Sequence, residues 1–134
     1  MAITIEWVNS EQSVIKLEFP QLWTWEEVYE VKRQLDSRLD QVDHDCAVLF
    51  ILPSNAKLPM NALSNGLRIL NDSHPRIRLF VIVTPSLFVR SVTEMVRKVS
   101  TDIRNRSRIV ETIEQAREAL VEAGYLTVRD RIGT

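Results

Sequence analysis

Residues 46–52, C-A-V-L-F-I-L, form an unbroken apolar run that stops at Pro53. Such a run, without alternating polar residues, is typical of a central strand that is covered on both faces of a sheet. A second apolar run, I-R-L-F-V-I-V at 77–83, follows a segment with helical spacing. Two buried strands separated by a helix predict a parallel pair joined by a right-handed crossover.

The chain before this run predicts a hairpin and then a helix. Apolar residues alternate with polar ones from Ile3 to Trp7, and again, mostly, from Val14 to Phe19 after a short polar link. This pattern indicates two antiparallel strands. Thr24 and Glu27 form a capping-box pattern, and the apolar residues that follow recur at helical spacing, so we expect a helix of about 17 residues.

Three further helices are expected after the central run, at 60–72, from Ser86 along one apolar stripe to Ile103, and after Thr112 until Gly124. Ile109 and Val110 are a short strand candidate. The order β-β-α-β-α-β-α-β-α predicts an α/β fold with a mixed, mostly parallel central sheet and helices packed on it. We expect one domain at 1–124, followed by a tail at 125–134.

The composition limits the class of protein. The chain has 134 residues, a net charge of −1 and one cysteine, Cys46, which excludes an intrachain disulfide. The first residues lack the basic start and apolar core of a signal peptide, and no apolar run approaches the roughly 20 residues that a membrane span needs. These features predict a cytoplasmic protein without a membrane span.

Basic residues are concentrated between positions 76 and 108. Residues 76–108 contain two acidic residues and eight basic ones: Arg76, Arg78, Arg90, Arg97, Lys98, Arg104, Arg106 and Arg108. This set is either a surface for an anionic partner or an ordinary solvated helix face. Few aromatic residues lie between these charges, so we do not expect a nucleic-acid partner.

The sequence gives little support for catalysis, a cofactor or a metal. His44 and His74 lie in separate loops, without ligands at the spacing of known zinc sites. The loop after the central run contains Lys57 but two prolines and no glycine before Gly66, so it lacks the backbone donors of a phosphate cradle. We therefore expect a protein that is not an enzyme.

Three stretches resemble a known family. They are A-V-L-F-I-L at 47–52 with the loop and helix after it, E-T-I-E-Q-A-R-E-A-L at 111–120, and L-W-T-W-E-E at 22–27. With the order of elements, they make residues 3 to 123 similar to the STAS domain, the family of the bacterial anti-sigma-factor antagonists. The third stretch resembles uncharacterised single-domain STAS-like proteins.

The resemblance implies a regulatory domain that docks a partner protein, such as an anti-sigma-type regulator. In the antagonists, an Asp-Ser pair begins the helix after the central strand, and a partner kinase phosphorylates that serine. The matching stretch here, L-P-M-N-A-L at 58–63, contains neither residue. We therefore expect docking without the phosphoserine switch, through Ser54, Asn55, Lys57, Leu58, Met60, Asn61 and Ser64.

Three alternatives remain open. The loop after the central run is a docking surface or an ordinary connection that tucks Leu58 into the core. A different alternative is a carrier domain for a small apolar or lipid-like ligand, with a pocket formed by Trp23, Trp25, Phe88 and Met95. The two tryptophans also fit a clasp that fixes the start of the helix. The tail at 125–134 is a candidate for joining two copies in a homodimer.

Overall fold

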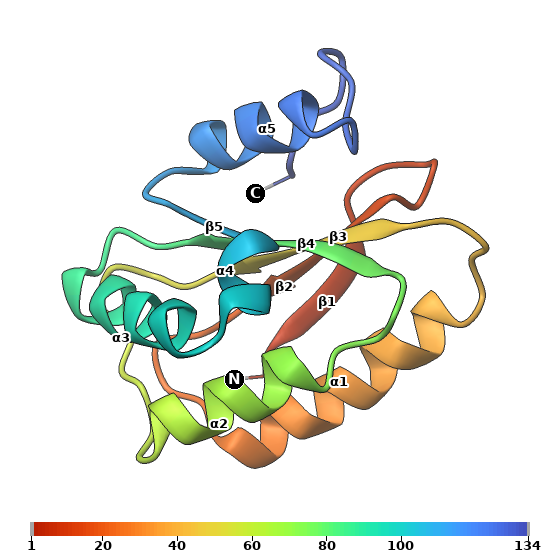
Figure 1. Ribbon diagram of the computed structural model, residues 1–134. Coiled ribbons are helices and arrows are strands. Elements are labelled where there is room, and N and C mark those ends of the chain that lie inside the picture. The colour runs from red at the N-terminus through yellow and green to blue at the C-terminus, as the bar shows by residue number, and fades with distance from the viewer. Residues whose placement is uncertain (1, 134) are drawn as a thin grey trace.

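The computed structural model describes residues 2–133, which form one five-stranded sheet (Figure 1). The strands lie in chain order, and only the first pair is antiparallel. They are β1 (Thr4–Trp7), β2 (Val14–Glu18), β3 (Cys46–Ile51), β4 (Ile77–Val83) and β5 (Ser107–Val110). The expected α/β fold and its order of elements are thereby confirmed.

The helices lie on both faces of this sheet. They are α1 (Trp25–Leu39), α2 (Ala62–Asn71), α3 (Leu87–Val99), α4 (Thr101–Asn105) and α5 (Ile113–Glu122). Because β2 to β5 follow one another in a single direction, right-handed crossovers place α1, α2 and α3 on the same face. Figure 1 shows α5 on the opposite face.

Two apolar cores result, one on each side of β3. The side chains of Cys46 and Val48 belong to the core beneath α1 and α2, whereas those of Ala47 and Leu49 belong to the core beneath α5. All four are fully buried. The central run is thus covered on both faces, as its composition predicts.

Both capping boxes are present. The hydroxyl oxygen of Thr24 accepts a hydrogen bond from the backbone of Glu27, and the Glu27 carboxylate accepts one from the backbone of Thr24. Thr112 and Gln115 make the same reciprocal pair at the start of α5. Each box satisfies backbone donors that the first helical turn leaves unpaired.

The third helix differs from its prediction. The stripe from Ser86 to Ile103 is broken at Ser100, which ends α3 and begins α4, because its hydroxyl accepts a hydrogen bond from the backbone N–H of Ile103. In α3, the buried residues are Val89 and Val96. Phe88, Met95 and Val99, which were expected on the buried stripe, are more than half exposed.

The C-terminal segment folds back onto its own chain. Leu126 and Ile132 are buried in the core beneath α5. The Ser13 hydroxyl donates a hydrogen bond of 2.6 Å to the carbonyl oxygen of Tyr125, and the Lys16 ammonium donates one of 2.7 Å to that of Gly133. Leu126 and Ile132 of the tail are therefore buried within the same molecule, whereas Val128 is 70% exposed.

Candidate apolar cavity and rim

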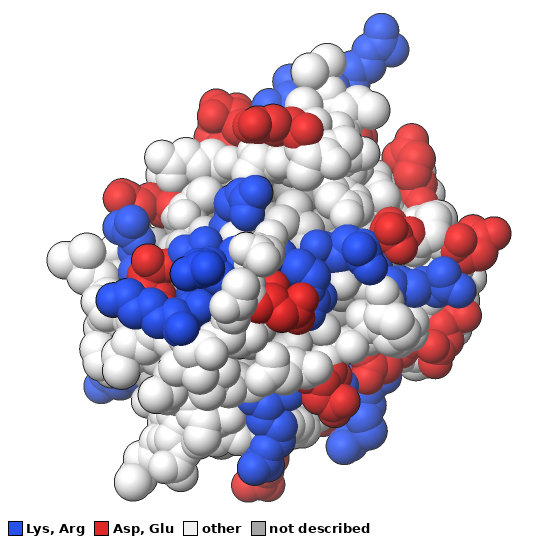
Figure 2. Space-filling view, in the orientation of Figure 1, with Lys and Arg blue, Asp and Glu red and all other residues white. Residues whose placement is uncertain are grey.

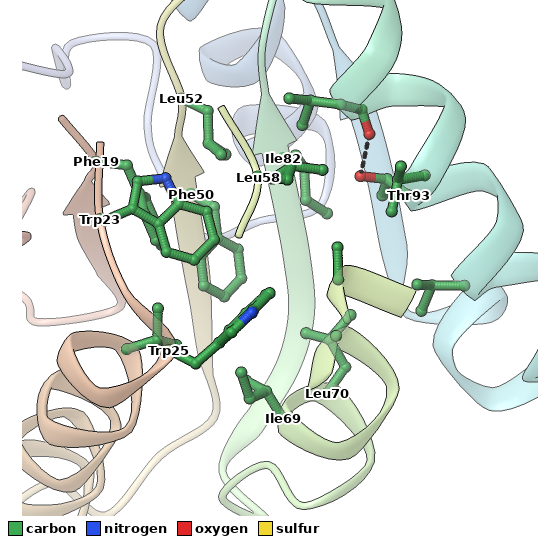
Figure 3. Close-up of a pocket in the computed structure, with 16 residues that line it drawn as sticks. Phe19, Trp23, Trp25, Phe50, Leu52, Leu58, Ile69, Leu70, Ile82 and Thr93 are labelled. Atoms are coloured by element: carbon green, nitrogen blue, oxygen red, sulfur yellow. Dashed lines mark hydrogen bonds between the residues drawn. The ribbon is translucent and has the colours of Figure 1, made fainter. Parts of the chain in front are cut away.

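A cavity of about 130 Å³ lies between the sheet and the helices α1, α2 and α3 (Figure 3). Phe50 of β3 and Ile82 of β4 form part of its floor, and Leu52 and Leu58 extend it into the loop after β3. The helices contribute the remaining wall with Trp25, Val28, Ala62, Gly66, Ile69, Leu70, Val89, Val92, Thr93 and Val96. It is thus close to the carboxyl ends of the parallel strands, where α/β proteins commonly bind ligands.

Aromatic rings line one side of this cavity. The ring centroids of Phe19 and Trp23 lie 5.1 Å apart, and those of Trp23 and Trp25 lie 4.9 Å apart with nearly perpendicular planes. Phe50 continues the row, 6.2 Å from Phe19. Edge-to-face contacts of this kind add to the stability gained from burying the rings. The row forms a stiff apolar wall that a ligand would contact face or edge on.

The lining is nearly free of polar groups. None of the residues that line the cavity carries a charge. The Thr93 hydroxyl already donates to the carbonyl oxygen of Val89, at 2.8 Å. The buried Nε1–H of Trp23 has no hydrogen-bond acceptor within residues 2–133. Because a charged group would lose its hydration here without compensation, the cavity suits an uncharged apolar group.

Helix α2 covers the cavity and is weakly held. It is amphipathic, yet none of its residues is fully buried. Asn61 begins it in the left-handed region, at φ 66°, and makes no side-chain cap. Gly66 lies in its middle, which costs about 1 kcal/mol relative to alanine in a helix. Few buried contacts and an uncapped start indicate that α2 opens at a lower free energy than α1.

Two hydrogen bonds join α1 to the loop before α2 and to the first turn of α2. The indole nitrogen of Trp25 donates a hydrogen bond to the carbonyl oxygen of Met60, and the Tyr29 hydroxyl donates one of 2.8 Å to the side-chain carbonyl of Asn65. Leu58 is half-buried and lines the cavity. The other residues expected in docking are exposed: Ser54, Asn55, Lys57, Met60, Asn61 and Ser64.

Large apolar side chains are exposed where three parallel strands end. Leu22 follows β2 and is 64% exposed, Met60 follows β3 and is 85% exposed, and Leu87 and Phe88 follow β4 and are 76% and 62% exposed. We call these four residues the apolar rim. Because the carboxyl ends of parallel strands meet at one edge of a sheet, the rim lies on the same edge as the cavity. Sequence reasoning named Met60 and Phe88 but missed Leu22 and Leu87.

Only two of the four residues expected to form a ligand pocket lie at the cavity. Trp23 and Trp25 line the cavity. Phe88 and Met95 do not, because α3 turns them outward and directs Val89, Val92 and Val96 toward the cavity instead. None of the arginines of residues 76–108 lines the cavity either.

Other polar groups of the described chain do not assemble into a recognisable centre. The Nε2 atom of His74 pairs with the carboxylate of Asp40 at 2.7 Å, whereas the ring of His44 contacts the backbone of Asp45. Across residues 2–133 no three His, Cys, Asp or Glu side chains gather in a way that would hold a metal ion. No helix in this range is long and apolar enough to cross a membrane.

Comparisons of the chain with protein-family models, with curated proteins and with solved structures found no match.

Proposed function

We propose that this protein is a non-catalytic docking domain whose partner protein binds at the carboxyl edge of the sheet. The partner covers the apolar rim and inserts an uncharged apolar side chain into the cavity behind it. The observation that carries this proposal is the exposure of four large apolar side chains that follow the carboxyl ends of three neighbouring parallel strands. Clustered apolar exposure next to a pocket is typical of an interface with a buried anchor residue.

The weak attachment of α2 supports the same conclusion. A helix without buried residues or a capped start can shift by a small amount at little cost, which makes room for an anchor residue. Filling the cavity would then give α2 the apolar contacts that it lacks. Binding energy comes from burying apolar area, at about 25 cal/mol per Å².

The resemblance to STAS domains gives additional support of a weaker kind. It suggests a regulatory partner of the anti-sigma type, which is an argument from fold analogy. The chain lacks the Asp-Ser pair at 58–63. Our proposal therefore contains no phosphorylation step, and affinity depends on shape and apolar contact alone.

A random peptide library displayed on phage tests this proposal without knowledge of the partner. We expect enriched peptides with an aromatic or aliphatic anchor, whose binding is lost when the rim carries Met60→Asp. Val128→Asp is the matched control, because Val128 is also a largely exposed apolar residue but lies outside the rim. Peptides that still bind the Met60→Asp variant, or that bind both variants equally weakly, would count against docking at the rim.

A second candidate function is favoured by the cavity itself. A small apolar or lipid-like molecule could occupy the space that we assign to the partner's anchor, and the uncharged lining would select a neutral one. Native mass spectrometry of the purified protein distinguishes the two functions. A bound neutral molecule that is absent from the Ala62→Leu variant supports the carrier, because Ala62 lines the cavity. An unliganded mass for both proteins favours docking.

A further inference from the structure

A shallow hollow of about 750 Å³ runs between helix α3 and the edge strand β5. Its α3 side is formed by Leu87, Arg90, Met95 and Lys98, and its β5 side by Arg108 and Ile109. We call it the edge groove. It shares no residue with the lining of the apolar cavity, but Leu87 belongs both to the edge groove and to the apolar rim.

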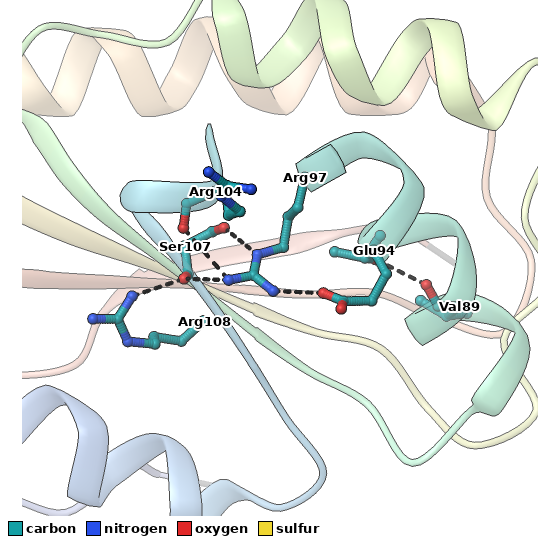
Figure 4. Close-up of polar contacts among 7 residues, drawn as sticks. Val89, Glu94, Arg97, Arg104, Ser107 and Arg108 are labelled. Carbon is teal, nitrogen blue, oxygen red and sulfur yellow. Dashed lines mark hydrogen bonds and ion pairs between the residues drawn. The ribbon is translucent and has the colours of Figure 1, made fainter. Parts of the chain in front are cut away.

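Arg97 fixes the two walls of the edge groove relative to each other (Figure 4). Its Nε donates a hydrogen bond of 2.9 Å to the hydroxyl of Ser107 in β5, and another guanidinium nitrogen pairs with Glu94 of the same helix. Ser107 is fully buried. Because Arg97 is bonded on both sides, it serves as a structural bridge between α3 and β5.

Several cations on this face have no acidic partner. Figure 2 shows basic side chains gathered over α3, α4 and β5. Within residues 2–133, Arg90 pairs with Glu111, at 3.0 Å, and Arg106 pairs with Asp102. Lys98, Arg104 and Arg108 are exposed and make no ion pair in this part of the chain. The uncompensated positive charge favours an acidic partner.

The backbone of β5 offers hydrogen bonds to the same partner. Phe80 and Thr84 donate to the carbonyl oxygens of Arg106 and Val110, so these alternate residues face β4. Backbone groups alternate in direction along a strand, so Arg108 also faces β4, whereas Ser107 and Ile109 direct their backbone groups the other way. The carbonyl oxygen of Ser107 already accepts hydrogen bonds from Arg97 and Arg108. The N–H and C=O of Ile109 therefore point away from β4, toward the side where the described chain provides no further strand.

We propose that the edge groove binds an extended, acidic segment of a partner protein, with alternating acidic and apolar side chains. The acidic side chains meet Lys98 and Arg108, the apolar ones cover Leu87 and Met95, and the backbone pairs with Ile109. Addition of a strand to a sheet edge beside a helix is a common mode of peptide recognition. Only one residue of β5 presents both backbone groups freely, so the affinity is modest. The ion pairs with Lys98 and Arg108 are exposed, so the affinity also falls as the salt concentration rises.

A nucleic acid fits the groove less well. The apolar side chains of Leu87 and Met95 have no counterpart in a phosphate backbone, and Glu94 would repel one. Phe88 is the one aromatic residue of α3, which leaves little surface on which bases could stack. A peptide with spaced carboxylates matches this mixture of apolar and basic groups more closely.

Fluorescence anisotropy with a labelled peptide of alternating Glu and Val tests the proposal on the full chain. We expect saturable binding at low salt that weakens as the salt concentration rises. The double variant Lys98→Glu and Arg108→Glu should weaken binding at least ~10-fold, as expected when about 1.4 kcal/mol is lost. The matched control is the double variant Arg129→Glu and Arg131→Glu, which makes the same charge change at exposed residues of the C-terminal segment.

Three results would overturn the proposal. One is the absence of saturable binding of the Glu-Val peptide at low salt. Another is an equal loss of affinity in the control double variant, which would indicate an effect of net charge alone. The last is tighter binding of an oligothymidine of the same charge, which would identify the surface as one for nucleic acid. A shift of the Ile109 amide resonance on peptide binding, absent with the oligothymidine, would support strand addition.

Discussion

The indole nitrogen of Trp25 donates a hydrogen bond of 2.7 Å to the carbonyl oxygen of Met60, 35 residues away in sequence. This bond joins the first turn of α1 to the loop that leads into α2. Trp25 also lines the cavity, and Met60 is the most exposed residue of the apolar rim. One contact thus connects the wall of the cavity with the surface at which we expect the partner to dock.

Trp25→Phe should loosen this connection while keeping an aromatic side chain in the wall. Loss of the hydrogen bond is expected to lower the free energy of unfolding by about 1 kcal/mol. Amide hydrogen exchange should become faster in the loop before α2 and within α2. Trp7→Phe is the matched control, since the Trp7 indole makes no hydrogen bond within the described chain. If both variants leave exchange in α2 unchanged, the Trp25 bond does not hold the loop.

Gly66 within α2 and Gly124 just after α5 should respond to alanine in opposite directions. A Cβ at Gly66 would lie 3.4 Å from a methyl carbon of Val96, which is close to an ordinary contact. Because alanine stabilises a helix interior, Gly66→Ala should raise the free energy of unfolding by about 0.5–1 kcal/mol. Gly124→Ala should lower the free energy of unfolding by about 1 kcal/mol, because Gly124 has a φ of 89°, in the left-handed region. Chemical denaturation of both variants measures these changes, and equal signs would contradict the conformations described here.

Lys16 forms a charged cluster beneath the C-terminal segment. Its ammonium is 3% exposed and lies 2.8 Å from Glu6, 2.9 Å from Glu18 and 2.7 Å from the carbonyl oxygen of Gly133. Burial opposes the charge of Lys16, but the two carboxylates outweigh it and raise the pKa of its ammonium. The hydrogen bond from Lys16, together with its charge, lowers the pKa of Glu6.

The pH dependence of stability follows from these two shifts. The contribution of Glu6 is present above its unfolded pKa near 4.5 and is lost as the pH falls through the lower folded value. That of Lys16 is complete below 10.5 and is lost as the pH rises through the higher folded value. We therefore expect this cluster to stabilise the fold fully between these limits.

Lys16→Met should remove the stabilisation and flatten its acid and alkaline limbs. We expect a loss of about 1–2 kcal/mol at neutral pH, because charge-assisted hydrogen bonds are replaced by apolar contact. Lys32→Met, which removes a partly exposed pair with Asp36 on one helix and a longer one, at 3.8 Å, with the exposed Asp72, should cost only about 0.5–1 kcal/mol. Thermal unfolding between pH 3 and 11 compares the variants. An unchanged pH profile for Lys16→Met would show that other groups determine it.

The sheet could be predicted because its signals are local. The runs at 46–52 and 77–83 carry enough apolar residues to specify buried strands, and each Thr with a Glu or Gln three residues later marks a helix start. The break at Ser100 has a local signal as well, a serine that caps the turn to Ile103. It was missed because Val99 and Ile103 continue the helical spacing across it.

The cavity and the tail depend on contacts that a sequence pattern does not contain. Phe88 and Val89 are adjacent, and either stripe through them has helical spacing, so only packing decides that Val89 is buried. The bond between Ser13 and Tyr125 joins residues 112 positions apart. The volume of the cavity is the small difference between the space enclosed by the sheet and helices and the volume of the side chains that fill it. The periodicity of apolar residues in a sequence does not measure that difference.

The central claim is that the cavity behind the apolar rim accepts an uncharged apolar group. A titration with benzene, followed by methyl NMR, tests it most directly, since an apolar cavity of similar size in another protein binds this molecule. We expect saturable shifts of the Leu58, Ile69 and Val92 methyl groups, with a Kd on the order of 1 mM or tighter. Benzoate, its charged counterpart, should cause none of these shifts.

Two variants of helix α2 complete this measurement. Ala62→Leu fills the cavity and should abolish the benzene shifts, whereas Ser64→Leu adds the same side chain to the exposed face of the helix and should preserve them. Loss of the shifts in Ala62→Leu alone is the result that the account predicts. Benzene shifts that do not saturate, or that persist unchanged in Ala62→Leu, would contradict it.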